Sequence, residues 1–483
     1  MTIRVYNTLT KQKEEFVPVH PGKANIYVCG VTPYNHPHIG NARPFVTWDV
    51  IRRFLEHEGY DVLHVQNFTD VDDKIINTAN KEGVLWSDVC GRYIDAYFEV
   101  MDKLNVRRAH VYPRVSEHME EIIETVKALI DRGYAYEMDG DVYYSVEKFE
   151  HYGELSGRNL EDMMAGARVD VNDKKHNPMD FALWKAAKPG EPSWSSPWGE
   201  GRPGWHIECS TMSMKYLGET FDFHGGGSDL IFPHHENEIA QSEGCTGCHP
   251  FVKYWLHNGF ITVNEEKMSK SLGKFLLLRD VLKTTDARVL RMLMLQTHYR
   301  SPLDFSDERL QEAQSALGRL TNFVNNTEWL CSNPAQEPSM LDLDAYRQAI
   351  DTMRDSFVEA MDDDFNTAGA LGAIFTFVSE ANSMLADTCV CCQNAEAVAL
   401  GAQAVTELLD VLGIELQDRQ GAEDDSASEV IALASSLAGY SGSDGEEAIQ
   451  SLLDCRAAAR KEKNFSLADQ IRDELGALGY TIE

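Results

Sequence analysis

The spacing of apolar residues changes period within the first seventy residues of the chain. A short apolar run, Ile26–Cys29, ends at Gly30 and predicts a buried strand. Apolar residues then recur at helical spacing between Val46 and Leu55, and a second short run, Val62–Val65, predicts the next strand. A strand, a loop, a helix and a strand in this order predict a βαβ unit. We therefore expect an α/β fold with a doubly wound parallel sheet and a ligand site at the carboxyl ends of its strands.

The pattern changes again further along the chain. Residues 116–199 are rich in Tyr, Trp, Gly and Pro, which predicts an insertion between two halves of the sheet domain. From about residue 310 the apolar spacing is helical. Polar, acidic stretches at 421–429 and 441–447 predict solvated connectors. The helical spacing is clearest in two sets of residues: Val405, Leu408, Leu409 and Leu412, and Ala468, Ile471, Leu475 and Leu478.

Length and charge restrict the kind of protein that carries these elements. The chain has 483 residues, which suggests about three domains, and 43% of them are hydrophobic, which excludes a disordered chain and a disulfide-stapled miniprotein. With 44 Lys and Arg against 77 Asp and Glu, the net charge is −33, so the surface as a whole repels nucleic acid. An RNA partner therefore needs local basic patches. Two candidate patches are Arg279, Arg288, Arg291 and Arg300, and Arg456, Arg460, Lys461, Lys463 and Arg472.

The sequence also indicates a cellular setting. The N-terminal segment contains no apolar stretch of the kind that directs secretion, and no run reaches the ~18 apolar residues of a membrane span. The chain has ten Cys, and without an export signal they predict free, catalytic or metal-bound thiols in a reducing compartment. We expect a cytoplasmic protein without a membrane partner.

The loop after the first predicted strand carries the first candidate chemistry, His38-Ile39-Gly40-Asn41. A helix N-terminus at this place favours anions, and Gly40 lets a nucleotide approach the backbone. His38 and Asn41 can donate hydrogen bonds to phosphate oxygens. Taken alone, the motif also fits an ordinary turn with an incidental His.

A second motif, Lys267-Met268-Ser269-Lys270-Ser271, follows much later in the chain. Two Lys three positions apart suit a mobile clamp on a triphosphate, since their charges stabilise the pyrophosphate as it leaves. The alternative for such a run alone is a solvated basic loop. The two motifs in this order are far more specific than either one, and together they resemble the signatures of class I aminoacyl-tRNA synthetases.

Four further residues form a candidate metal site. His234 and Glu238 are spaced i, i+4 in a predicted helix, so both side chains lie on one face. Together with the thiols of Cys29 and Cys209 they form a plausible zinc-binding set. By spacing alone, the alternative is a pair of core thiols and an ion pair on a helix surface.

Seven segments identify the family that the chain resembles. The resemblance is to the cysteinyl-tRNA synthetases, and it runs from the first residues to about 415 and, more weakly, to the end. It implies a Rossmann-like parallel-sheet catalytic core split by an insertion, an α-helical anticodon-binding region and a small C-terminal region. The segments are YVCGVTPYNHPHIGNARP, NFTDVDDKI, GRPGWHIECS, FDFHGGGSDLIFPHHENEIAQSE, EEKMSKSLGK, HYRSPLDFS and AMDDDFNT.

The resemblance also implies a reaction. ATP, accompanied by Mg²⁺, activates L-cysteine to cysteinyl-adenylate, and the cysteinyl group passes to tRNA(Cys). The family binds one zinc ion per chain through residues matching Cys29, Cys209, His234 and Glu238. Cysteine and serine differ only by sulfur against oxygen, and zinc prefers a soft thiolate, so the metal can read the substrate's sulfur. Four protein ligands close a zinc site, so recognition requires five-coordination or a loosely held Glu238.

The resemblance also implies functional roles for further residues. Asn41 stands where the idealised signature has its last His, and its amide can still donate. Lys274 stands where the family usually has Asn, and we interpret it as facing solvent. The implied catalytic residues are His38, Asn41, Lys267 and Lys270. The implied substrate- and ATP-binding residues are Gly30, Gly40, Thr69, Trp205, His224, Gly226, Asp229 and Lys270.

We expect a monomer divided into six segments. They are 1–115, the first half of the Rossmann-like catalytic core; 116–199, an inserted connective domain; 200–255, the second half of the core; 256–310, a linker domain with the Lys motif; 311–415, a helical anticodon-binding domain; and 416–483, an acidic connector and a small C-terminal region contacting tRNA.

Two other functions stay open at this point. One is a cysteine ligase that acts on a small amino-sugar acceptor. The other is a non-catalytic, zinc-dependent tRNA-binding paralogue.

Overall fold

The computed structural model describes residues 2–158, 175–263, 266–267, 276–336, 339–386, 388–417, 426–440, 442, 445–461 and 464–477. The chain divides into two compact units, Met1–Ile414 and Glu415–Glu483. Each unit is described by itself. Among the described residues, none of the helices is both long and apolar enough to cross a membrane.

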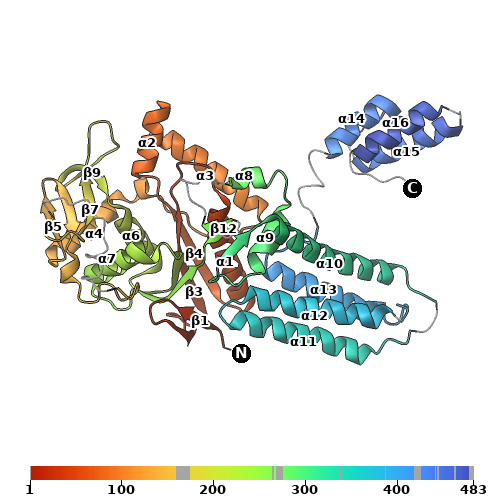
Figure 1. Ribbon diagram of the computed structural model, residues 1–483, viewed down its shortest axis with the longest axis horizontal. Helices are drawn as coiled ribbons and strands as arrows, with labels where there is room; N and C mark the ends of the chain where they lie inside the picture. The colour runs from red at the N-terminus through yellow and green to blue at the C-terminus, as the bar shows by residue number, and fades with distance from the viewer. Residues whose placement is uncertain are drawn as a thin grey trace. The chain divides into compact units, whose positions relative to one another are not determined.

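The centre of the first unit is a four-stranded parallel sheet with the strand order β11-β10-β3-β4 (Figure 1). The apolar runs predicted as strands lie in β3 and β4, and the predicted helix between them is α1, so the predicted βαβ unit is confirmed. Apolar residues of β3 are almost completely buried because both faces of a parallel sheet are covered. The bounds are β3 (Lys23–Val31), α1 (Ile39–His57), β4 (Asp61–Phe68), β10 (Phe221–Gly227) and β11 (Val252–Asn258).

Helices flank this sheet. Figure 1 shows α6 and α7 on one side of β3 and β4, and α1 on the other. Helix α6 leads into β10, and α7 joins β10 to β11, which brings both helices to the middle of the sheet. The bounds are α2 (Asp73–Glu82), α3 (Trp86–Lys103), α6 (Trp205–Leu217) and α7 (Glu236–Thr246).

A second, antiparallel sheet lies between β4 and β10 in the sequence, where the insertion was predicted. Its strand order is β5-β6-β7-β9-β8, and it shares one hydrophobic core with α4 and the parallel sheet. The antiparallel sheet therefore packs directly on the parallel sheet. The bounds are α4 (Met119–Asp131), β5 (Ala135–Met138), β6 (Asp141–Tyr144), β7 (Phe181–Ala186), β8 (Trp194–Ser196) and β9 (Gly199–Pro203).

Two small sheets and two helices complete the part of the unit around the parallel sheet. Strands β1 and β2 pair at the N-terminus, and β12 pairs with β13 and β14. The bounds are β1 (Arg4–Asn7), β2 (Gln12–Glu15), β12 (Ile261–Val263), β13 (Glu266–Lys267), β14 (Leu303–Phe305), α8 (Leu278–Val281) and α9 (Ala287–Leu295).

The predicted helical region is a bundle of long helices (Figure 1). Its apolar faces point inward, as the predicted residues Val405, Leu408, Leu409 and Leu412 show, since all four are buried. The bounds are α10 (Asp307–Ser332), α11 (Leu343–Asp362), α12 (Thr367–Ala386) and α13 (Ala395–Val411).

One residue of the first predicted basic patch is not on the surface. Arg291 of α9 is 1% exposed, pairs with the carboxylate of Asp49 and donates to the carbonyl of Leu412 over 2.8 Å. The interpretation of Arg291 as a phosphate contact is therefore wrong: the guanidinium fastens α9 to α1 and to the end of α13. Sequence spacing could not separate a buried Arg from an exposed one.

The described part of the second unit consists of three helices with their own core. Ala468, Ile471 and Leu475 of the predicted amphipathic segment are buried in it, while Leu478 lies outside the described residues. The predicted connectors extend too far, because residues 426–429 and 445–447 are helical. The bounds are α14 (Ser426–Ala438), α15 (Gly445–Lys461) and α16 (Phe465–Ala477), and the core residues are Val430, Ala434, Ala448, Leu452, Ile471 and Leu475.

Candidate metal centre and active site

The four predicted metal ligands, far apart in the sequence, lie together in the fold. Cys29 comes from β3, Cys209 from α6, His234 from the turn before α7, and Glu238 from α7. One donor atom from each lies within 4.8 Å of all the others. The Sγ atoms of Cys29 and Cys209 are 3.7 Å apart, and His234 Nε2 is 3.0 Å from Glu238 Oε1. None of the four residues is more than 8% exposed, so the cluster is largely shielded from bulk water.

A kink in the chain presents the imidazole to this cluster. Phe232 has extended backbone angles, φ −138° and ψ 132°, within the short helical turn that precedes α7. The helix proper then begins at Glu236, which puts Glu238 one turn after His234. This is the i, i+4 pair expected from the sequence.

A second donor set overlaps with the first. His224 and His235 also approach Cys29 and Glu238 closely enough to share a metal ion with them. His224 Nε2 is 2.8 Å from Glu238 Oε2, and His235 Nε2 is 3.4 Å from Cys29 Sγ. Each oxygen of Glu238 thus faces a different imidazole.

Three of the histidines around the cluster were not found from the sequence. His206 Nδ1 is 2.9 Å from His234 Nδ1, and His235 Nδ1 is 2.7 Å from His257 Nε2. His235 adjoins His234 in the sequence, which was the one available signal. His206 and His257 stand on other elements, and their place beside the cluster follows only from the folded sheet.

Burial and the opposite charges in the cluster shift its pKa values strongly. Burial would raise the pKa of Glu238, but His224 and His234 hold the pKa at about 2. Burial would lower the pKa of His234, but the Glu238 carboxylate and the Cys209 thiol raise it to about 10. The hydrogen bond with Cys29 lowers the pKa of the Cys209 thiol to about 6, despite burial. The cluster therefore offers an ionised carboxylate and a readily formed thiolate to a cation.

Residues implied for the amino-acid pocket surround the cluster. Trp205, 41% exposed, stacks on His234 with ring centroids 4.4 Å apart. Thr69 is buried and accepts a hydrogen bond of 3.3 Å from the amide of Asn67, whose oxygen accepts from the backbone N–H of Gly30 over 2.9 Å. A Cβ atom at Gly30 would lie 1.5 Å from the Asn67 carbonyl oxygen, so only glycine fits there.

The residues implied for the adenosine side lie at or just after the carboxyl end of β10. A Cβ atom at Gly226 would be 2.8 Å from Leu230 Cδ1 and 3.9 Å from Cys29 Cβ. This glycine therefore lies directly beside the cluster of candidate metal ligands. Asp229 follows β10, with its carboxylate close to Gly227. His224 is completely buried and contacts Glu238, so its imidazole faces the metal cluster.

The His38–Asn41 motif forms the start of α1. His38 is the N-cap, Gly40 lies in the first turn, and Asn41 Oδ1 accepts from the His38 backbone N–H over 3.0 Å. Because its oxygen is used in this way, the amide NH₂ of Asn41 is the part of the side chain suited to a phosphate oxygen. The helix N-terminus adds a positive field at the same place.

The chain that follows the second motif returns to this turn. The N–H of Ile39 donates to Leu276 O over 3.0 Å, and the N–H of Leu278 donates to Pro37 O over 2.9 Å. Lys267 ends β13, and Lys270 lies outside the described residues. The segment that follows the second motif in the sequence thus contacts the first motif, far away along the chain.

Comparison with protein families decides the identity of the chain. The family model described as the class I (C) tRNA synthetase catalytic domain matches residues 15–315. A DALR domain matches residues 356–417, and the cysteinyl-tRNA ligase anticodon binding domain matches residues 443–483. The chain belongs to the cysteine–tRNA ligase family. As a class I aminoacyl-tRNA synthetase of this family, it is an enzyme that ligates cysteine to tRNA.

Individual relatives agree with this assignment. The cysteine–tRNA ligase of Carboxydothermus hydrogenoformans is 52% identical over 481 residues, covering 100% of this chain and 98% of the relative. The cysteine–tRNA ligase of the archaeon Thermococcus gammatolerans is 50% identical, covering 100% of this chain and 97% of the relative. The similarity therefore includes the catalytic domain, the bundle and the C-terminal unit.

Solved structures of other synthetases share the fold. Methionyl-tRNA synthetase of Mycobacterium tuberculosis, in complex with methionyl-adenylate, superposes with a TM-score of 0.61 at 15% identity, covering 81% of this chain and 90% of that one. A putative arginyl-tRNA synthetase of Campylobacter jejuni gives a TM-score of 0.57 at 12% identity, covering 82% of this chain and 94% of that one. The predicted Rossmann-like fold class is confirmed.

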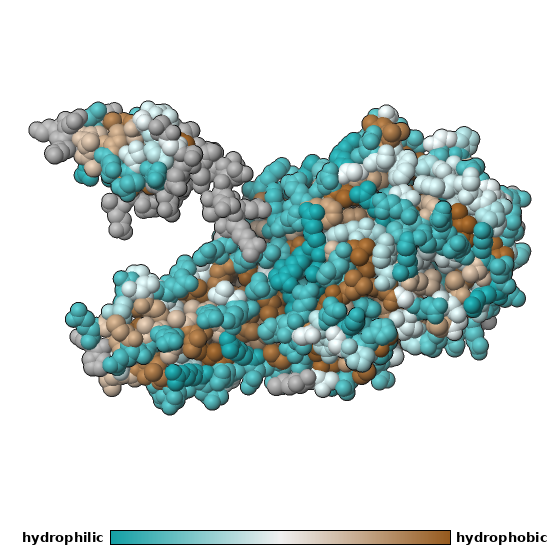
Figure 2. Space-filling model, turned by 180° about the vertical axis from the view of Figure 1, so that it is seen from behind, coloured by the Kyte–Doolittle hydropathy of each residue, from teal (hydrophilic) through white to brown (hydrophobic). Residues whose placement is uncertain are grey.

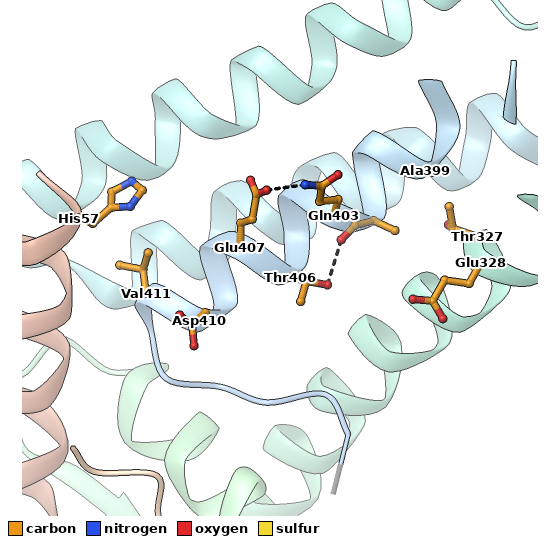
Figure 3. A pocket seen from close by; sticks show the side chains of 10 residues that line it. His57, Thr327, Glu328, Ala399, Gln403, Thr406, Glu407, Asp410 and Val411 are labelled. Atoms are coloured by element: carbon orange, nitrogen blue, oxygen red, sulfur yellow. Dashed lines mark hydrogen bonds between the residues drawn. The ribbon is translucent and has the colours of Figure 1, made fainter. Parts of the chain in front are cut away.

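A separate pocket of about 790 Å³ lies between α10 and α13, near the end of α1 (Figure 3). It contains none of the predicted catalytic or metal-binding residues. Carboxylates of Glu328, Glu407 and Asp410 line it, and the last two pair with arginine side chains.

Proposed function

We propose that the enzyme activates L-cysteine with ATP and Mg²⁺ and transfers it to tRNA(Cys). One bound zinc ion would recognise the substrate by coordinating its sulfur. The observation that carries the metal assignment is the buried cluster of Cys29, Cys209, His234 and Glu238, four donors within 4.8 Å of one another. Two thiols, an imidazole and a carboxylate are donors that zinc accepts readily. When bound, zinc supplies a soft Lewis acid that prefers sulfur to oxygen.

The set with two thiols is the better candidate of the two overlapping sets. His235 already contacts His257 over 2.7 Å, and His224 contacts the other oxygen of Glu238 over 2.8 Å. These contacts suit residues that orient metal ligands rather than ligands themselves. Trp205 stacks on His234, and Asn67, whose amide donates to Thr69, has its Oδ1 atom 3.8 Å from Cys209 Sγ. This arrangement fits an amino-acid substrate at this place.

In the first step, the cysteine carboxylate attacks the α-phosphate of ATP in line, and pyrophosphate leaves. His38 and the NH₂ of Asn41 donate to phosphate oxygens at the N-terminus of α1. Lys267 and Lys270 stabilise the charge that builds on the pyrophosphate. Correct placement of the two substrates suffices for this chemistry, so the step needs no covalent protein nucleophile.

In the second step, the terminal ribose hydroxyl of the tRNA attacks the carbonyl carbon of the adenylate, the ester forms, and AMP leaves. We assign residues 311–415 and 416–483 to the tRNA, and the remaining predicted divisions to the catalytic part of the enzyme. Arg460 and Arg472 of the C-terminal unit are exposed, as phosphate contacts require. We expect the enzyme to be a monomer in the cytoplasm.

Two assays together separate this proposal from its rivals. Cysteine-dependent exchange of pyrophosphate into ATP shows activation, and charging of a tRNA pool shows the acceptor. Exchange with charging supports the proposal. Exchange without charging, or the absence of both activities, would contradict the proposal.

A further inference from the structure

A turn of the insertion holds the first residue of α7. The Oε1 atom of Glu236 accepts from the backbone N–H of Gly153 over 3.0 Å, and Oε2 accepts from that of Ser156 over 2.8 Å. A third, longer contact of 3.4 Å comes from the N–H of Leu155. Glu236 is 1% exposed, so the turn replaces the water that its carboxylate would otherwise bind.

The backbone of this turn is shaped to receive a carboxylate. Gly153 and Gly157 have φ angles of +102° and +67°, which side chains other than glycine rarely adopt, and they let successive N–H groups point inward. Hydrogen bonds to an ionised acceptor are about twice as strong as neutral ones. The carboxylate also lies at the N-terminus of α7, where the helix field favours negative charge.

Neighbouring contacts fasten the same part of α7 to the insertion. The hydroxyl of Tyr152 donates to Asn237 Oδ1 over 2.5 Å, and that of Tyr144 donates to Ala240 O over 2.8 Å. The guanidinium of Arg158 lies 5.2 Å from the ring of Phe232, the residue with extended angles just before His234. The insertion therefore contacts the segment 232–240 before, between and after His234 and Glu238.

We propose that Glu236 is a positioning residue for cysteine recognition, through which the insertion holds His234 and Glu238 in place. His234 lies two residues before Glu236, and Glu238 two residues after it. Metal–ligand distances tolerate shifts of only about 0.2 Å, so a small displacement of this turn weakens metal binding. The inference rests on the proposed metal site, and it adds a role for the insertion in substrate recognition.

The test compares Glu236→Gln with Glu243→Gln in the full-length enzyme. In the first variant, an amide NH₂ replaces one of the two carboxylate oxygens. That NH₂ group faces a backbone N–H, so one hydrogen bond is lost. The control residue is also a buried carboxylate of α7, and it accepts from the N–H of Phe251 over 3.0 Å, beyond the metal ligands. Both variants lose one buried carboxyl group on the same helix, and only the first touches the turn with the ligands.

We expect E236Q to lower zinc affinity 10–100-fold in competition with a chelator. The KM for cysteine should rise about tenfold, which corresponds to the lower end of the range expected for zinc affinity. The KM for ATP should stay within about twofold of the wild-type value. E243Q should leave both the zinc affinity and the cysteine KM unchanged. E236Q with a lower unfolding temperature but normal zinc affinity and cysteine KM would overturn the inference, because that is the result of a purely structural role.

Two further measurements keep the outcomes distinct. If the unmodified enzyme holds no zinc, the proposed metal site itself fails. If E236Q does not fold, Tyr152→Phe, which removes the hydroxyl bonded to Asn237, replaces it. That variant should weaken zinc binding about threefold, as expected from the loss of one hydrogen bond, and unchanged binding would overturn the inference.

Discussion

At the scale of single residues, the chemistry of the metal centre follows from donor types that the sequence displays. The i, i+4 spacing of His234 and Glu238 was readable, because a helix fixes which side chains share a face. The meeting of Cys29 with Cys209 was not, since 180 positions separate them and only the folded sheet brings them together. His206 and His257 were missed for the same reason. The family resemblance, rather than spacing, selected the ligand set.

Replacing one thiol tests this set. Cys209→Ser should reduce the zinc content from about one per chain to nearly none, because a hydroxyl is a poor ligand for a soft metal site. Metal analysis of protein purified without added metal measures it. Cys248→Ser, which changes a partly exposed thiol on another segment, is the control and should keep its zinc. Zinc retained by the Cys209 variant would exclude the proposed ligand set.

Replacing one Lys of the second motif tests the activation chemistry. Lys270→Ala should slow adenylate formation by about 10²-fold or more, because one preorganised charge on the leaving pyrophosphate is lost. Rapid-mixing measurement of adenylate formation gives this rate, and the zinc content should not change. Lys274→Ala, which removes a nearby Lys outside the motif, is the matched control. An unchanged rate in the Lys270 variant would remove this residue from the mechanism.

At the scale of elements, α1 is the part of the fold that was best predicted. It also connects β3 to β4 and is tied to α9. Its apolar period marked it in the sequence, and the strands on either side were confirmed. The strands of the insertion were not predicted individually, because aromatic and Gly/Pro-rich composition shows no period. Nor did the sequence show that α1 carries a buried charge cluster, Asp49 with Arg53 and Arg291, which ties it to α9.

Removing the carboxylate of this cluster should destabilise the first unit. Although burial would raise it, the neighbouring guanidinium groups of Arg291 and Arg53 lower the pKa of Asp49. Asp49→Asn leaves two buried cations without their partner, which costs about 3–5 kcal/mol of unfolding free energy at pH 7. Denaturant unfolding of the two proteins measures the difference.

The same cluster of Asp49, Arg53 and Arg291 predicts that stability depends on pH. A carboxyl whose folded pKa is depressed contributes stability at pH values above its unfolded pKa of about 4, and loses it as the pH falls through the folded pKa. The difference between the wild type and Asp49→Asn should therefore be constant from pH 7 to about 5 and shrink below about 4. A difference that does not change with pH would contradict the assignment of a charged Asp49.

At the scale of the whole molecule, two separate units serve one reaction. An acidic chain that binds RNA needs local basic surfaces, and the C-terminal unit carries the exposed Arg460 and Arg472. Figure 2, which shows one face of the molecule, has hydrophilic residues over most of the surface. The helical regions were predictable from their period; the sequence predicts a boundary after residue 415, and the compact units divide after Ile414.

Removing the C-terminal unit should separate the two half-reactions. A cut after Ile414 keeps the compact first unit, whereas a cut near residue 310 would remove the carbonyls of Leu412 and Gly413 that accept from Arg291 and Asn105. The shortened enzyme should still exchange pyrophosphate with cysteine and ATP, and its tRNA charging should collapse.

Circular dichroism shows whether the shortened enzyme is folded. Charging by the full-length enzyme should weaken steeply with salt, because phosphate contacts release counterions. A folded chain that ends at Ile414 and charges tRNA(Cys) as well as the full-length enzyme would refute the role of the C-terminal unit.

The central claim is that a zinc ion at Cys29, Cys209, His234 and Glu238 binds the sulfur of the substrate. X-ray absorption at the zinc edge, recorded with and without L-cysteine, measures it most directly. Without cysteine we predict two sulfur neighbours at about 2.3 Å, the usual zinc–thiolate distance, and with cysteine three. Serine should add none. A sulfur count that stays at two when cysteine is bound would contradict the account.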